Sequence, residues 1–166
     1  MEDLNHYVQL YQTQLKKGDI QKAYIGLIKF IMQLKADFSR DLSELFSFGN
    51  ISPGYLDFTY FPFSNVFLRE RKLRFGIVFN HEKLRFELWL MGQNSDIQKQ
   101  YWEMLKSCTW NIHQRHMPKY SVLEVVLVDN PDFNYLEQLS QEIRQAMLQF
   151  TPKIINVLEK TDIKTE

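Results

Sequence analysis

Polar and aromatic side chains share one face of a sheet that the sequence predicts. Apolar and polar residues alternate through residues 73–79 and 84–90, the two strands of a predicted β-hairpin. Successive side chains of a strand point to opposite faces, so the non-core positions gather on a single surface. The same alternation in residues 55–61 and 122–128 adds members from two further strands. This candidate polar sheet face consists of Asp57, Thr59, Arg74, Arg85, Glu87, Trp89 and Glu124.

One chemistry open to this face is metal-dependent cleavage of phosphodiesters. Two or three converging carboxylates can hold a hard divalent cation, which prefers oxygen ligands. The predicted order α-β-β-β-α-β is similar to that of the restriction-endonuclease-like core, which carries an acid on its second strand and an acid-x-Lys motif on its third. Asp57 and Glu87 match the acid positions loosely, and Glu124 adds a carboxylate, but residue 89 is Trp instead of Lys. The hypothesis requires these carboxylates to converge in a cleft.

The same face is also compatible with an ion pair or with a small-molecule cavity. Arg85 and Glu87 are suitable ion partners for each other on a solvated surface. Alternatively, Tyr55, Tyr60, Arg85 and Trp89 surround a cavity for a small molecule. Aromatic walls with a few arginines suit a small organic acid or a peptide.

Motifs for other catalytic chemistries are missing from the chain. There is no Gly-x-Ser-x-Gly elbow, the six glycines form no phosphate-binding loop, and Cys108 has no matching set of zinc ligands. We therefore expect no cofactor and no metal. The preferred interpretation is a non-enzymatic binding or interaction module, with a metal-dependent nuclease-like domain and a small-molecule-binding pocket protein as alternatives.

Composition narrows the partners and the compartment. The 166 residues carry 20 basic and 20 acidic side chains, a balance that argues against a general nucleic-acid binder. A single cysteine, Cys108, indicates a reducing compartment, and no signal peptide or membrane span is visible, so we expect a cytoplasmic protein. The partner is unknown, and Trp89 with Met91 offers a possible homodimer contact.

Periodicity predicts an α+β fold in a single domain over residues 1–160, followed by a frayed tail at 161–166. The order is α-α-β-β-β-α-β-α, with a short extra helix before the hairpin, and the four strands form a mixed or antiparallel sheet with helices packed mainly on one face. Pro62 should end the first strand because it cannot donate to a sheet ladder. The predicted helices cover 3–16, 20–45, 64–71, 95–108 and 130–158, and the strands cover 55–61, 73–79, 84–90 and 122–128.

Several longer motifs carry a resemblance. They read GDIQKAY (18–24), YFPF (60–63), FNHEKLRFELWL (79–90), GQN (92–94), IQKQYW (97–102) and VDNPDFN (128–134). With these motifs the chain resembles a family of small uncharacterised bacterial proteins, a domain of unknown function, over nearly its whole length. The resemblance implies a bacterial, cytoplasmic protein, and it implies no substrate, cofactor or catalytic residue.

Overall fold

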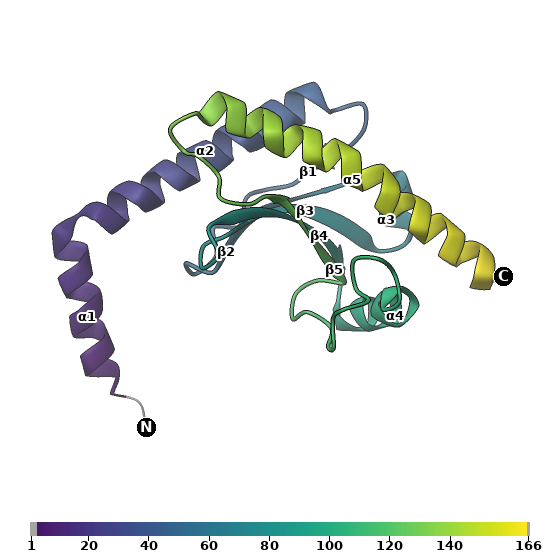
Figure 1. Ribbon diagram of the computed structural model, residues 1–166, viewed down its shortest axis with the longest axis horizontal. Coiled ribbons are helices and arrows are strands. Elements are labelled where there is room, and N and C mark those ends of the chain that lie inside the picture. Colours follow the sequence, from purple (N-terminus) through teal and green to yellow (C-terminus); the bar gives the residue numbers. More distant parts are fainter. Residues whose placement is uncertain (1–2, 166) are drawn as a thin grey trace.

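The computed structural model describes residues 3–165 and confirms an α+β architecture (Figure 1). Five helices and five strands follow one another in this part of the chain. Their bounds are α1 Leu4–Lys17, α2 Asp19–Asp41, β1 Ser47–Phe48, β2 Phe58–Ser64, α3 Val66–Glu70, β3 Leu73–Asn80, β4 Arg85–Gly92, α4 Ser95–Leu105, β5 Leu123–Val128 and α5 Leu136–Thr165. No helix among these residues is long and apolar enough to cross a membrane.

The sheet has five strands in the order β1-β2-β3-β4-β5, and every neighbouring pair is antiparallel. The prediction of four strands was wrong because β1 has two residues, too few for alternation to reveal it. The predicted end of the strand at Pro62 was also wrong. Pro62 lies within β2 opposite Gly76, and its carbonyl accepts a hydrogen bond from Gly49 N (2.8 Å) at the edge of the sheet. There its missing N–H interrupts no bond to β3.

Two helices cover one face of the sheet, which we call the core face. Figure 1 shows α2 and α5 lying together over the strands. From α2, the Phe30 ring packs on Phe86 (centroids 5.8 Å apart) and the Phe38 ring packs on Phe61 (6.3 Å). From α5, Ile143 and Met147 join the same apolar cluster. The predicted inward face of the hairpin is confirmed, since its strand residues are buried in this core: Leu73, Phe75, Ile77, Phe79, Phe86, Leu88 and Leu90. Leu84, predicted among them, lies instead in the turn and is exposed.

Helix α1 is the exception to this packing. Gly18 separates it from α2 and adopts a left-handed conformation (φ 81°), which glycine tolerates without strain. The chain turns there, and α1 points away from the sheet (Figure 1). None of its residues is buried.

The C-terminal helix α5 is long and contains Pro152 in its interior. Near its end the Asp162 carboxylate accepts hydrogen bonds from the guanidinium of Arg71, which follows α3. The helix therefore continues beyond residue 160. The expected fraying of residues 161–166 concerns motion in solution and stays a prediction, as does the single-domain boundary.

Candidate functional site

Most of the predicted polar face lies where alternation placed it. Arg85, Glu87 and Trp89 of β4 share the face of the sheet opposite α2 and α5, which we call the outer face, and Glu124 of β5 pairs with Trp89. Thr59 does not belong there. It pairs with Phe79 of the core face and is fully buried.

Asp57 also departs from the prediction, because it precedes β2 and lies in a loop. Its Oδ1 accepts hydrogen bonds from the backbone N–H groups of Tyr55 (2.8 Å) and Phe58 (2.7 Å). These amide bonds lower the pKa of Asp57, because they stabilise the charged carboxylate. Asp57 is therefore an anion that holds the loop in shape at one end of the outer face.

The Glu87 carboxylate is the centre of a buried polar network. Its Oε2 accepts hydrogen bonds from Arg85 Nε (2.7 Å) and Asn80 Nδ2 (3.1 Å), and its Oε1 accepts one from Trp89 Nε1 (2.9 Å). Only 1% of Glu87 is exposed. Arg85 and Glu87 are therefore ion partners, as one of the sequence hypotheses proposed, but the pair is covered instead of solvated. The hydrogen bond to Glu87 Oε1 also fixes the indole ring of Trp89 at its polar edge.

Beside this network lies a small apolar cluster separate from the main core. Val78, Trp89 and Met91 are buried, and Phe58 and Tyr60 pack against them. The Phe58 and Trp89 rings meet edge to face, with centroids 4.8 Å apart. Because Trp89 and Met91 are covered within the chain, they do not form the exposed homodimer contact that the sequence left open.

A cleft of about 300 Å³ opens over this apolar cluster on the outer face. Five of its lining residues are aromatic, and two charged residues, Arg74 and Asp57, lie along it. Tyr55 is 95% exposed, and its loop forms one side of the opening. Tyr120, from the segment between α4 and β5, forms another side and lies 6.3 Å from Phe58, centroid to centroid. The lining residues are Ser52, Gly54, Tyr55, Asp57, Phe58, Tyr60, Arg74, Trp89, Met91, Gly92 and Tyr120.

His81 helps to hold the loop that contains Asp57. Its backbone N–H donates to the Asp57 carbonyl (3.0 Å), and its Nε2 lies 2.7 Å from Thr59 Oγ1. The single hydroxyl proton of Thr59 is directed to the Pro53 carbonyl (2.7 Å), so His81 Nε2 is the donor of the second bond. Burial lowers the pKa of His81, and the smaller effect of Asp57 opposes that shift. His81 is therefore a neutral ring that helps hold the loop in place.

The three carboxylates required by the metal hypothesis do not form a metal site. Glu124 accepts a hydrogen bond from Ser121 Oγ (2.8 Å), and burial of its carboxyl end raises its pKa, with a further rise from Glu87. Glu87 already has three donors, and Asp57 is bound to backbone amides. Within residues 3–165, no group of three His, Cys, Asp or Glu side chains is placed to share a metal ion.

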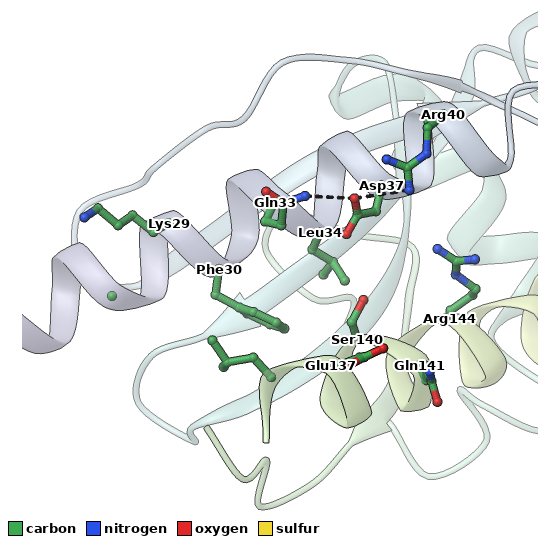
Figure 2. A pocket seen from close by; sticks show the side chains of 12 residues that line it. Lys29, Phe30, Gln33, Leu34, Asp37, Arg40, Glu137, Ser140, Gln141 and Arg144 are labelled. Carbon is green, nitrogen blue, oxygen red and sulfur yellow. Dashed lines mark hydrogen bonds and ion pairs between the residues drawn. The ribbon is translucent and has the colours of Figure 1, made fainter. Parts of the chain in front are cut away.

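A second and larger hollow, of about 690 Å³, lies between α2 and α5. Figure 2 shows Phe30 and Leu34 pointing from α2 toward α5, with charged side chains along both rims. Sequence reasoning missed this groove, because its walls belong to two helices more than ninety residues apart. The lining residues are Gly26, Lys29, Phe30, Gln33, Leu34, Asp37, Arg40, Leu136, Glu137, Ser140, Gln141 and Arg144.

Sequence reasoning also missed one wall of the outer-face cleft. The sequence hypothesis placed Tyr55, Tyr60, Arg85 and Trp89 around a cavity. The two tyrosines and Trp89 do line the cleft, but its arginine is Arg74 and not Arg85. Tyr120 had no signal, since it lies in an irregular segment without periodicity.

A scan of protein families finds a match for nearly the whole chain. A family model described as Domain of unknown function (DUF7000) matches residues 4–158 of the 166. No curated protein and no solved structure matches the chain.

Proposed function

The chain belongs to the DUF7000 family, a domain of unknown function, and from that premise we propose that it is a non-enzymatic binding module. The observation that carries this proposal is the aromatic cleft on the outer face, with an arginine that the described residues leave unpaired. Arg74 is exposed, and no described residue forms an ion pair or a side-chain hydrogen bond with it. An aromatic wall and an available guanidinium together suit a ligand with a flat apolar body and an anionic end.

The ligand class that fits best is a small organic acid that carries a ring. The volume of about 300 Å³ is at the lower end of the range for small-molecule pockets, so the occupant is of single-ring or two-ring size. The ring would lie against Tyr60, Trp89 and Tyr120, and the carboxylate would pair with Arg74. The Glu87 network supports this function, because it holds Trp89 in one orientation before a ligand arrives.

An enzymatic alternative lacks comparable support. The carboxylates that a metal-dependent nuclease would use are engaged in structural hydrogen bonds: Glu87 with side-chain donors, Asp57 with backbone amides and Glu124 with Ser121. The proposed module needs none of them to be free. A bacterial origin and a cytoplasmic location stay predictions, and the single Cys108 supports the reducing compartment.

Ligand-observed NMR with phenylacetate, compared with neutral phenylacetamide, tests the proposal. We expect the wild-type chain to bind the acid more tightly than the amide. Replacing Arg74 with Gln should weaken phenylacetate binding by about fivefold to tenfold and leave phenylacetamide unaffected, because the substitution removes one charge-assisted contact.

Matched variants separate the cleft from the rest of the surface. Tyr120→Ala should weaken binding of both compounds, whereas Tyr135→Ala, at an exposed tyrosine outside the cleft, should not. Lys99→Gln removes a cation from α4 and serves as the control for Arg74→Gln. Equal affinity of the acid and the amide, or an Arg74→Gln variant indistinguishable from Lys99→Gln, would contradict the proposed ligand class.

A further inference from the structure

We propose that helix α1 of one chain docks into the groove between α2 and α5 of a second copy, so that two chains exchange helices about a two-fold axis. This inference does not depend on the outer-face cleft. It starts from a helix whose apolar side is left uncovered by residues 3–165 of its own chain, and from a groove that the same residues leave open.

Helix α1 presents an apolar stripe to solvent. Leu4, Val8, Tyr11 and Leu15 recur at intervals of three and four residues, which places them on one side of the helix. Leu4 is 71% exposed and Tyr11 is 61% exposed. An isolated helix of 14 residues is marginal in water, because most helical stability in proteins comes from packing of the apolar face. We therefore expect the apolar stripe of α1 to pack against another surface.

The groove between α2 and α5 offers such a surface. Leu136 is 45% exposed in the groove, Phe30 and Leu34 form its buried apolar floor, and Gly26 forms part of one wall. A Cβ atom added at Gly26 would meet nothing within 4 Å. Glycine in a helix interior costs about 1 kcal/mol relative to alanine, and no described neighbour in the same chain explains that cost. A helix docked from a second copy would explain it, because a bare Cα lets its backbone approach closely.

The dimensions of the two partners agree. The α2 wall runs from Gly26 to Arg40, a span of about 22 Å at 1.5 Å per residue. The 14 residues of α1 extend about 21 Å. One complete helix thus matches the length of the α2 wall.

Charges select the direction of docking. Arg40 and Arg144 lie together at one end of the groove, where both pair with Asp41, and Arg40 also pairs with Asp37. The Arg40 side chain remains 68% exposed and has donors to spare. The other end carries Glu137 and Lys29, and the described residues supply no ion partner for either side chain.

An α1 helix that enters antiparallel to α2 places Asp3 beside the exposed Arg40, and it places Lys16 and Lys17 beside Glu137. The reverse direction would place both lysines beside Arg40 and Arg144, and Asp3 beside Glu137.

Helix α1 cannot reach the groove between α2 and α5 of its own chain. To fold back onto α2, α1 would have to reverse direction within Gly18 alone, whereas connections between antiparallel helices take two to five residues. A folded-back α1 would also begin beside Asp19, seven residues before the groove starts at Gly26. The occupant is therefore a second copy, and the reciprocal contact closes the pair.

Sedimentation equilibrium and light scattering on the full chain test the proposal. We expect the wild type to form a dimer at micromolar concentration. Val8→Asp, which places a charge in the stripe, should weaken dimerisation by about thirtyfold or more, whereas Thr13→Asp on the opposite side of α1 should not. Gly26→Leu fills the groove and should also give monomers, whereas Ala36→Leu on an exposed part of α2 outside the groove should leave the dimer intact.

Two complementation measurements make the test specific to this contact. A mixture of Val8→Asp chains, whose groove is intact, with Gly26→Leu chains, whose α1 is intact, should form heterodimers although each variant alone is monomeric. The double charge reversal Lys16→Glu/Lys17→Glu should weaken the dimer, and Glu137→Lys in the same chain should restore it. A wild type that is monomeric at about 100 μM would overturn the proposal. So would a dimer whose affinity is unchanged by Val8→Asp and by Gly26→Leu, or a mixture of the two variants that stays monomeric.

Discussion

At the scale of single residues, the Glu87 carboxylate has the largest expected effect on stability. Three donors, Arg85, Asn80 and Trp89, depend on it for a buried acceptor. We expect Glu87→Ala to lower the free energy of unfolding by about 3–5 kcal/mol, because it leaves a partly buried guanidinium and two neutral donors unpaired. Urea unfolding followed by circular dichroism measures this difference.

A neighbouring acidic residue provides the control for Glu87. Glu82 lies in the hairpin turn and is exposed, so Glu82→Ala should change the free energy of unfolding by no more than about 0.5 kcal/mol. Similar effects of the two substitutions would mean that the Glu87 network contributes little to the fold.

The partly buried ring of His81 predicts how stability depends on pH. Burial lowers the pKa of His81 in the folded chain below its value of about 6.5 in the unfolded chain. Between those two values the unfolded state binds more protons, so the free energy of unfolding should fall as the pH drops below about 6.5. The contribution is fully present above that pH.

Unfolding measured across this pH window checks the role of His81. His81→Gln should flatten the slope of the free energy of unfolding against pH in this window. His113→Gln, at an exposed position, should leave that slope unchanged. The slope is the informative quantity, since His81→Gln also removes the hydrogen bond to Thr59. Parallel pH profiles for His81→Gln and the wild type would contradict the assignment.

Alternation predicted the outer face well where a strand is long and poorly where a strand begins. Arg85, Glu87 and Trp89 lie on one strand, β4, and a period of two assigns them without ambiguity. Asp57 was misplaced because β2 starts at Phe58, so that its side chain follows the loop and not the pleat. That Glu87 is buried could not be predicted, because alternation assigns a residue to a face of the sheet and does not say whether that face is covered.

At the scale of elements, helices and the hairpin were predicted more accurately than their ends. The helix predicted over residues 3–16 is α1, which ends at Lys17 with Gly18 as its C-cap. The helix predicted over residues 95–108 is α4, which begins at Ser95 but ends at Leu105; the Asn94 side chain caps its start by accepting a hydrogen bond from Ile97 N (3.0 Å). Helix α5 starts at Leu136, not near residue 130, because Asp132 forms a local turn with Asn134 N (2.9 Å).

Pro152 gives a prediction for helix α5. Proline normally kinks or breaks a helix, yet α5 continues through Pro152 from Leu136 to Thr165. Proline in a helix interior costs about 3 kcal/mol relative to alanine, offset in part by the lower entropy of the unfolded chain. Because Pro152 is exposed, we expect Pro152→Ala to raise the free energy of unfolding by about 1–2 kcal/mol. Lys153→Ala is the neutral control in the same thermal unfolding experiment, and a destabilised Pro152→Ala would show that Pro152 contributes to the packing of α5.

At the scale of the whole molecule, the two hollows lie on opposite sides of the sheet. The groove is bounded by α2 and α5 over the core face, and the cleft opens on the outer face. Substitutions at distant sites without shared partners act additively. We therefore expect Gly26→Leu to leave phenylacetate affinity unchanged within about twofold, and Arg74→Gln to leave dimerisation unchanged. Titration of each variant in both assays measures the coupling, and a larger effect would reveal communication through the sheet.

This arrangement of layers marks the limit of sequence reasoning. The α+β class follows from periodicity, because each apolar stripe must be buried against another element. The pairing of α2 with α5 does not follow, since any apolar helix face is compatible with several neighbours. The groove and the cleft arise from such pairings.

The strand order also bears on how the chain reaches its native state. Each strand of the sheet pairs with its predecessor in the sequence, so no strand has to be threaded between two others. Sheets built from sequential neighbours close short loops and avoid the slow search that distant pairings impose. We expect the β3–β4 hairpin to form early, and the packing of α2 on the sheet to come late. Stopped-flow refolding should then give a higher φ-value for Ile77→Val than for Leu34→Ala, and the opposite order would place the nucleus in the helical layer.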